Sequence, residues 1–366
     1  MGSYNITVVP GDGIGKEVCD AALHVLEGVQ SDALELKFES FAAGAQCYLD
    51  TGVAYPDKTR AACRAGDAIL HGASGLPSVC YPDGTEAGQD FVLQTRVDLD
   101  LYANVRPIHL FEGVNAPLAG RKAGDIDYII VREGNEGLYA SRGHGIVLHD
   151  EFAVDQLMVS RKGVTRIVKM AADLARRHRG APEDGAKRLT IVDKANVLRS
   201  FAFFRKVALE TVADYPDLEI EHVLTDAMSL YMVERPHHYS VVVAENFVGD
   251  LLSDLGAATI GGLGLAPSAE IGDRHALFQA SHGSAPTIAG KNIANPAATI
   301  LSAAMMLDWF GSTRNDEAAT RAAGRIRAAV GHSLTSPETR TTDVGGTAST
   351  SDVANAVRRR IEGTPA

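Results

Sequence analysis

The sequence lacks the features that mark secreted, membrane-spanning or zinc-binding chains. Its 366 residues include only four cysteines, all within the first 80 positions, at spacings that fit neither a zinc site nor a CxxC redox pair. No HExxH pattern occurs, no apolar run approaches the ~20 residues of a membrane helix, and the N-terminus has no signal-peptide core. We therefore expect reduced thiols, a cytoplasmic location and no membrane partner.

Positive charge is also scarce. The formal net charge is −11, which argues against nucleic acid or an anionic membrane as the main partner. Any acidic substrate must then be bound by local arginines that act against the overall field. An apolar content of 45% is ordinary for a globular protein, and the length favours two domains over one.

Short apolar runs alternate with helical patterns along most of the chain, which is typical of an α/β fold. Polar side chains follow several of these runs directly: Arg132, Lys194, Asp226 and Asn246. In open α/β sheets, ligands bind beyond the carboxyl ends of the strands. These four positions therefore predict a binding site. Further along, residues 313–330 and 353–361 show helical patterns, the latter with a helix start at residues 349–352.

Asp250 and Asp254 lie one helical turn apart, which places both carboxylates on one face of a predicted helix. Like charges at this spacing repel by roughly 0.2–0.5 kcal/mol. A divalent cation would turn the repulsion into attraction, and hard oxygen ligands suit Mg²⁺ or Mn²⁺. The alternative is an ordinary exposed acidic face.

Two glycine-rich loops could contact phosphate. Gly11, Gly13 and Gly15 follow a predicted strand, but their GxGxG spacing is not GxGxxG, and a tight strand-to-helix turn explains them. The loop at residues 282–296 is rich in small and polar residues and precedes a helix from Ala297. Backbone amides at such a helix start can hold phosphate groups.

Together these segments resemble the β-decarboxylating dehydrogenases, the family of isocitrate, homoisocitrate, 3-isopropylmalate and tartrate or D-malate dehydrogenases. The resemblance runs in order through nearly the whole chain, carried by residues 9–15, 101–107, 131–139, 193–197, 246–254, 282–296 and 343–347. It implies a two-domain α/β fold of the isocitrate/isopropylmalate dehydrogenase type, which is not a Rossmann fold. Residues 1–102 and 255–366 would form a large cofactor-binding domain, and residues 103–254 a small domain with the dimer interface. Lys194 and Asp226 would serve the active site of the partner subunit in a homodimer.

The resemblance also assigns roles to individual residues. The substrate would be a malate with a variable group at C3, oxidised at C2 by hydride transfer to NAD and then decarboxylated. Substrate carboxylates would bind Arg96, Arg106 and Arg132, because guanidinium forks match carboxylates. Asp226, Asp250 and Asp254 would hold Mg²⁺ or Mn²⁺. Lys194 would assist removal of the hydroxyl proton, and Tyr139 would protonate the enolate left after CO₂ departs.

The cofactor assignment rests on the second glycine-rich loop and a C-terminal segment. Thr287 stands where NAD-dependent members of the family often carry Asp, and Thr287 and Ile288 offer neither that acid nor the Lys-Tyr pair of NADP users. We favour NAD, with NADP open if Arg321, Arg325 or Arg340 meets its phosphate. Gln279 departs from the family's usual Glu. The residues that would contact the cofactor are His282, Gly283, Ser284, Ala285, Thr287, Ile288, Asn295 and Asp343.

Substrate choice would depend on Gln89, Asp90 and Val92, just before Arg96. They match neither the isocitrate pattern nor the isopropylmalate pattern, and Asp90 would repel an additional carboxylate. Segments 101–107 and 132–139 are nevertheless closer to the isocitrate and homoisocitrate enzymes. The open alternatives are a 3-isopropylmalate or tartrate/D-malate dehydrogenase, an enzyme of a specialised pathway acting on an isocitrate analogue, and a catalytically silent regulatory homologue.

Overall fold

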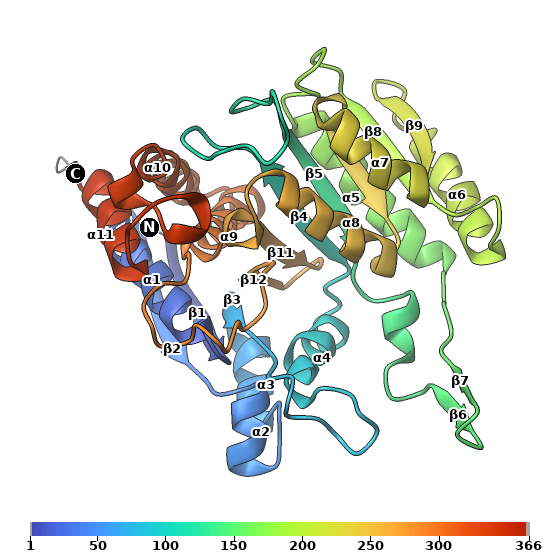
Figure 1. Cartoon of the computed structure of the whole chain (residues 1–366), viewed down its shortest axis with the longest axis horizontal. Coiled ribbons are helices and arrows are strands. Elements are labelled where there is room, and N and C mark those ends of the chain that lie inside the picture. Colours follow the sequence, from blue (N-terminus) through green and yellow to red (C-terminus); the bar gives the residue numbers. More distant parts are fainter. Residues whose placement is uncertain (1, 364–366) are drawn as a thin grey trace. The chain divides into compact units, whose positions relative to one another are not determined.

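The computed structural model describes residues 2–363, which belong to two compact α/β units (Figure 1). Unit 1 comprises Met1–Leu101, Phe111–Asn115 and Gly261–Ala366, and unit 2 comprises Tyr102–Leu110 and Ala116–Ile260. The predicted α/β class is confirmed. The predicted domain boundary at residue 254 would cut helix α8 (Asn246–Thr259), which unit 2 keeps whole.

Unit 1 is built on a mixed sheet in the order β2-β1-β3-β12-β11. Only the β11–β12 pair is antiparallel among these described neighbours. Helix α9 packs against β11 and β12, and α1 packs against α9 and α11. The strands are β1 (Gly2–Gly11), β2 (Leu34–Ser40), β3 (Ala68–Ala73), β11 (Pro267–Ile271) and β12 (Ala276–Ala280). The helices are α1 (Gly15–Glu27), α2 (Ala45–Thr51), α3 (Asp57–Ala65), α4 (Asp90–Asp98), α9 (Ala297–Arg314), α10 (Glu317–Ser333) and α11 (Thr350–Ile361).

Unit 2 has a sheet in the order β4-β5-β10-β8-β9, in which β5, β10, β8 and β9 run parallel. Helix α5 packs against this sheet and against α6, and α8 packs against β4 and β5. The strands are β4 (Ala103–His109), β5 (Asp127–Glu133), β8 (Arg188–Asp193), β9 (Glu219–Leu224) and β10 (Val241–Ala244), with a separate hairpin of β6 (Ile146–Leu148) and β7 (Phe152–Val154). The helices besides α8 are α5 (Arg161–Arg177), α6 (Arg199–Val212) and α7 (Thr225–Glu234).

The parallel strands of unit 2 end at one edge of the sheet, and each predicted polar residue lies there. Arg132 is near the end of β5, Lys194 directly follows β8, Asp226 is in the first turn of α7 after β9, and Asn246 begins α8 after β10. The predicted strand ends are therefore confirmed. Their common edge is a consequence of parallel pairing, since parallel strands point their carboxyl ends the same way.

The glycine-rich segment after β1 is a structural turn, as its spacing predicted. The Asp12 carboxylate is buried and accepts backbone N–H bonds from Ala45 at 2.8 Å, Gln46 at 2.9 Å and Gly75 at 2.8 Å. The amide of Ile14 donates to the Ser284 carbonyl at 2.8 Å. These groups already have partners, so the turn has little left with which to hold a phosphate.

The C-terminal helices differ in part from the prediction. The helical pattern at residues 313–330 spans a break, because Asn315 has φ 54° and α9 ends before it. Asp316 then caps α10, accepting from the amides of Ala318 and Ala319. The predicted start of the last helix is confirmed by a capping box between Ser349 and Asp352.

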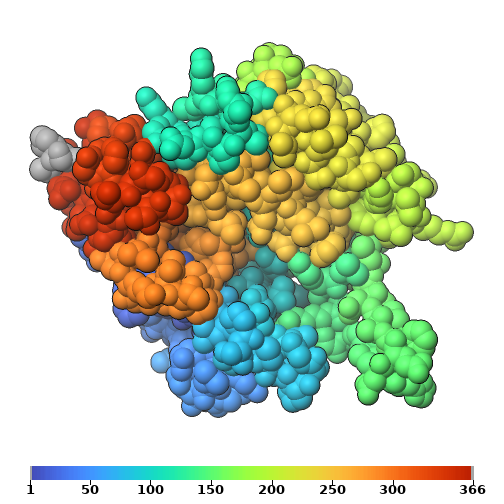
Figure 2. Space-filling model, viewed as in Figure 1, coloured from blue at the N-terminus to red at the C-terminus, as the bar shows by residue number. Residues whose placement is uncertain are grey.

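The β6–β7 hairpin is an arm with an apolar surface. Figure 2 shows its residues (green) as a lobe apart from the helices of unit 2. Val147 is 68% exposed and Phe152 62% exposed, and Ile146, Leu148 and Val154 are exposed as well. An isolated two-stranded hairpin is only marginally stable in water, so we expect an apolar arm of this kind to pack against a partner surface.

Within residues 2–363, no helix combines the length and apolar character needed to cross a membrane. Cys19, Cys47 and Cys63 are buried, Cys80 is exposed, and none forms a disulfide in this part of the chain.

Candidate active site

Helix α8 brings two carboxylates against two buried arginines in unit 2. Arg132 donates to Asp250 through Nη1 and to Asn246 through Nε, the latter at 2.9 Å. Arg106 on β4 donates to Asp254 Oδ1 at 3.2 Å and to Ser253 Oγ at 2.7 Å, and its Nη2 lies 3.5 Å from Asp250 Oδ1. We call Arg106, Arg132, Asp250 and Asp254 the α8 cluster.

Local sequence explains why this cluster forms. Glu245 caps α8 by accepting from the amides of Phe247 and Val248, which fixes where the helix begins. Asp250 and Asp254 then share one face. Gly249 lies against Arg132: an added Cβ there would come within 2.7 Å of the Arg132 Cβ. A larger residue at 249 would push the helix away from the arginine.

The carboxylates of the cluster are more open than its arginines. The Arg132 side chain is 3% exposed, whereas the Asp250 side chain is 30% and the Asp254 side chain 56% exposed. Partial burial raises the pKa of Asp254, which nearby Asp250 raises further and Arg106 lowers. Two adjacent acids of this kind remain reachable from solvent and are hard oxygen donors.

Tyr139, which the family resemblance suggests as a proton donor, lies beside the α8 cluster. Its hydroxyl donates to Asp250 Oδ2 at 2.7 Å, and the Arg132 guanidinium lies 5.3 Å from its ring centroid. Gly137, just before it, has φ 80°, and a side chain there would collide with Glu245. The turn at Gly137 therefore allows Tyr139 to approach α8.

Lys194 and Asp226 form a second group in unit 2. Lys194 Nζ donates to Asp226 Oδ1 at 2.6 Å, and this hydrogen bond is the main cause that lowers the pKa of the carboxyl. Among the described residues, no three His, Cys, Asp or Glu side chains gather in a way that could hold a metal ion. One copy of the chain thus does not bring Asp226 together with Asp250 and Asp254.

The residues predicted to select the substrate lie at the start of α4 in unit 1. The Asp90 carboxylate accepts from the Tyr81 hydroxyl at 2.7 Å and from Gln94 Nε2 at 3.1 Å. Val92 is only 8% exposed and belongs to a core cluster with Phe91 and Leu101. Gln89 lies close to Gly75, since a Cβ added at Gly75 would come within 2.8 Å of Gln89 Nε2.

Arg96, at the other end of α4, has a partner that no motif in the sequence indicates. Its Nη2 lies 2.5 Å from Oε1 of Glu270, a buried residue of β11. Gln279 on β12 donates to the same oxygen at 3.2 Å. The available signal was a single acid inside a short apolar strand, Pro267–Ile271, which would be costly to bury without a cationic partner.

The loop at residues 282–296 is held by the glycine turn and by the C-terminal segment. Ser284 Oγ donates to the Gly75 carbonyl, and Asn295 Nδ2 donates to Asp343 Oδ2 at 3.0 Å. Thr287 is exposed, while Ile288 and Ala285 pack beside Ile14. His282 and Gly283 begin the loop, and the His282 ring lies 3.0 Å from the Gly283 carbonyl.

The arginines considered for an NADP phosphate are engaged elsewhere. Arg340 donates to the carbonyls of Gly113 and Leu334, the latter at 3.1 Å. Arg325 donates to the Ile361 carbonyl at 2.6 Å, and Arg321 pairs with Glu317 one turn away at 3.2 Å.

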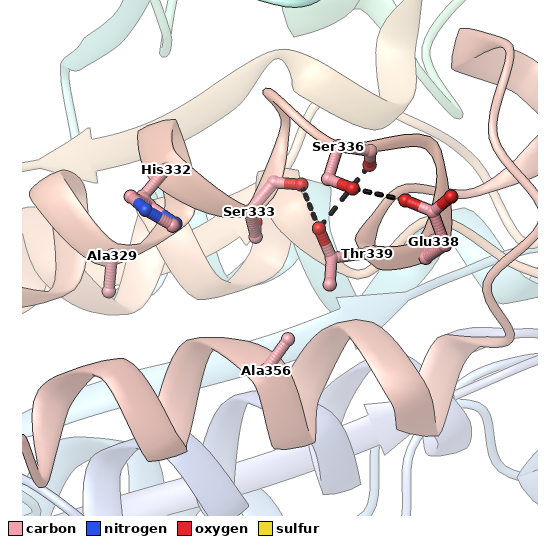
Figure 3. A pocket seen from close by; sticks show the side chains of 7 residues that line it. All are labelled: Ala329, His332, Ser333, Ser336, Glu338, Thr339 and Ala356. Atoms are coloured by element: carbon pink, nitrogen blue, oxygen red, sulfur yellow. Dashed lines mark hydrogen bonds between the residues drawn. The ribbon is translucent and has the colours of Figure 1, made fainter. Parts of the chain in front are cut away.

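A separate pocket of about 280 Å³ lies between α10 and α11 in unit 1 (Figure 3). It includes none of the predicted site residues. Ser336 donates to Glu338, and Thr339 donates to the Ser333 carbonyl at 2.6 Å, so its polar groups serve the turn that follows α10. Its lining is Ala329, His332, Ser333, Ser336, Glu338, Thr339 and Ala356.

Comparison with known proteins gives one consistent result. The profile of a family described as isocitrate/isopropylmalate dehydrogenase matches residues 5–357. The 3-isopropylmalate/3-methylmalate dehydrogenase of Methanocaldococcus jannaschii is 39% identical over 359 residues, covering 98% of this chain and 99% of that protein. The 3-isopropylmalate dehydrogenase of Bacillus caldotenax is 41% identical over 333 residues, covering 89% and 87%. The crystal structure of isocitrate dehydrogenase from Methylococcus capsulatus superposes with a TM-score of 0.86 at 36% identity, covering 98% of this chain and 99% of that one.

Proposed function

The chain belongs to the isocitrate/isopropylmalate dehydrogenase family and is a decarboxylating oxidoreductase of CH–OH groups, and from this we propose the metal-dependent, NAD-linked oxidation and decarboxylation of a 3-substituted malate. The observation that carries the proposal is the α8 cluster with Tyr139. It combines carboxylate-binding forks, oxygen donors for a cation and a proton donor in one place.

Asp250 and Asp254 fit a divalent ion by their chemistry and their exposure. They would hold Mg²⁺ or Mn²⁺ together with Asp226 from a second subunit. When bound, the ion would lower the pKa of the substrate hydroxyl and stabilise negative charge on oxygen as CO₂ leaves.

The chain's own residues would position the substrate and move its protons. Arg106 and Arg132 would bind two carboxylate groups, exchanging part of their contact with Asp254 and Asp250 for the substrate. Lys194 Nζ, as the neutral amine, would accept the proton of the C2 hydroxyl, directly or through water. After the C2 hydride has passed to nicotinamide and CO₂ has departed, the Tyr139 hydroxyl would donate its proton to C3 of the enolate.

A homodimer would bring Lys194 and Asp226 to the α8 cluster of the other subunit. Exposed apolar side chains lie near both residues that would enter the partner's site. Val197 and Leu198 follow Lys194, and Leu230 lies one turn beyond Asp226. The β6–β7 arm adds a further apolar surface. Replacing Val147 and Phe152 by Asp should convert a dimer to monomers in sedimentation experiments and abolish turnover. Leu49→Asp, at an exposed apolar residue of α2 in unit 1, should do neither.

Unit 1 would bind the dinucleotide through the loop at residues 282–296 and Asp343. NAD is favoured over NADP because Arg321, Arg325 and Arg340 all have partners within unit 1. A 2′-phosphate would have to compete with these partners for an arginine.

Turnover assays would test the proposal directly. Isocitrate, homoisocitrate, 3-isopropylmalate, tartrate and D-malate would each be tried with NAD and NADP, with Mg²⁺ or Mn²⁺ and after chelation. Metal-dependent NADH formation with matching CO₂ release would support the proposal. NADH without CO₂ would contradict the decarboxylation, and no turnover would favour a silent regulatory homologue.

A further inference from the structure

A buried ion pair in unit 1 joins Arg96 to Glu270. The Glu270 side chain is 0% exposed and that of Arg96 6% exposed, and Oε1 and Nη2 lie 2.5 Å apart. The other carboxylate oxygen, Oε2, is buried and has no hydrogen-bond partner among residues 2–363. Glu270 therefore depends on Arg96 for most of its stabilisation. Removing Arg96 would leave the buried Glu270 charge without its ion-pair partner.

Gln279 completes the pair from the neighbouring strand. In the antiparallel β11–β12 register, Gln279 is opposite Ser268, so Glu270 is its diagonal neighbour on the same face of the sheet. Its amide Nε2 donates to Glu270 Oε1 at 3.2 Å. A carboxylate at position 279 would instead face Glu270 with like charge. The replacement of the family's usual Glu by Gln279 is thus explained by the presence of Glu270.

The charges around α4 have a consequence for the substrate. Glu270 cancels the positive charge of Arg96, and the Asp90 carboxylate, which accepts from Tyr81 and Gln94, adds a negative charge at the start of the same helix. Asp98 at the end of α4 is paired with Arg60. The α4 region thus has little net positive charge with which to attract an additional anion.

We propose that Glu270 positions Arg96 and cancels its charge, so that the enzyme selects malates whose C3 substituent is uncharged over those with an additional carboxylate. This inference rests on the proposed function and on the role in substrate binding that the family resemblance gives to Arg96. Glu270 is a positioning residue, because it would act on the substrate through Arg96.

Substrate preference in two variants tests the inference. The wild type should favour 3-isopropylmalate over isocitrate. Glu270→Gln removes the cancelling charge and should shift the ratio of kcat/KM values toward isocitrate by about tenfold or more. The double variant Glu270→Gln, Gln279→Glu returns one carboxylate to the same face of the sheet and should restore the preference for 3-isopropylmalate. Asp98→Asn, which breaks another ion pair of α4, should lower thermal stability without changing the ratio.

Binding of the same two acids, measured by thermal shift with Mg²⁺ and without dinucleotide, gives the preference independently of turnover. If the wild type binds 3-isopropylmalate more tightly and Glu270→Gln reverses this, the inference holds even when no turnover is found and the proposed reaction fails. The inference would be overturned if the wild type and Glu270→Gln showed the same preference between the two acids. It would also be overturned if Asp98→Asn changed this preference as much as Glu270→Gln does. A wild type that favours isocitrate would overturn it as well.

Discussion

Two arginine–carboxylate groupings, one in each unit, differ in how reachable their acids are. In the α8 cluster of unit 2, Asp250 and Asp254 are partly exposed while Arg106 and Arg132 are buried. In unit 1, Glu270 is as buried as its partner Arg96. An acid that is open to solvent can exchange its arginine for a cation or a substrate, whereas a fully buried one is fixed. The first arrangement suits a reacting site, and the second suits a permanent adjustment of charge.

The largest effect should come from removing an open acid. Asp250→Asn deletes a proposed metal ligand and breaks the ion pair between Asp250 and the buried Arg132. We expect kcat/KM to fall on the order of 10³-fold. Mg²⁺ should also raise the melting temperature of the wild type and leave that of the variant unchanged. Asp217→Asn, at an exposed acid paired with Arg176, is the matched control and should behave like the wild type. A variant that retains activity and its response to Mg²⁺ would contradict the role of the α8 cluster.

Tyr139→Phe should have the next largest effect. It removes the hydroxyl that donates to Asp250 while keeping the ring beside Arg132. Loss of a general acid of this kind lowers kcat by about 100-fold, and KM for the hydroxy acid should change little. Steady-state kinetics of the variant and of Tyr231→Phe, a tyrosine of α7, would measure this. Equal kcat in all three proteins would remove Tyr139 from the mechanism.

The buried imidazole of His71 should affect the stability of the fold and not the reaction. His71 on β3 is fully buried, with Nδ1 2.7 Å from the Val9 carbonyl and Nε2 2.8 Å from Ser74 Oγ. Burial lowers its pKa to about 4, so the folded protein keeps it neutral while the unfolded chain takes up a proton below about pH 6.5. Stability is therefore retained at neutral pH and lost as the pH falls toward 4.

Between pH 7.5 and pH 5 this residue should account for about 2 kcal/mol of lost unfolding free energy. Urea unfolding at the two pH values measures the loss. His71→Gln should reduce the pH dependence by that amount, even if the variant is less stable at both pH values. His144→Gln, at an exposed position, should leave it intact. An unchanged pH dependence in His71→Gln would mean that the imidazole is not held neutral.

How much the sequence could predict also depends on whether a contact is local. The helix that carries Asp250 and Asp254 and the polar residues at the strand ends were predictable, because period and strand direction are local properties. The break at Asn315 was missed because the helical pattern continues across it. Motifs indicated Arg96 and Gln279, but their link through Glu270 joins residues 174 positions apart. Such a pairing depends on how helix α4 and strand β11 come together in the fold, which no single segment specifies. Val92, predicted to contact the substrate, packs in a core cluster with Phe91 and Leu101, a contact that the α4 sequence alone does not specify.

The smallest effect should come from Thr287, an exposed residue of the cofactor assignment. Thr287 lies at the surface of the loop at residues 282–296, so a substitution there should not disturb packing. Thr287→Asp would supply a carboxylate for the adenosine ribose hydroxyls and should lower KM for NAD about fivefold, since a hydrogen bond to a charged group exceeds one to a neutral group. The same charge would repel the phosphate of NADP and raise its KM. Thr287→Ser keeps the hydroxyl and should change neither value. If the wild type already used NADP better than NAD, the choice of cofactor would be wrong, whereas the comparison between open and buried acids would still hold, because it rests on residues outside this loop.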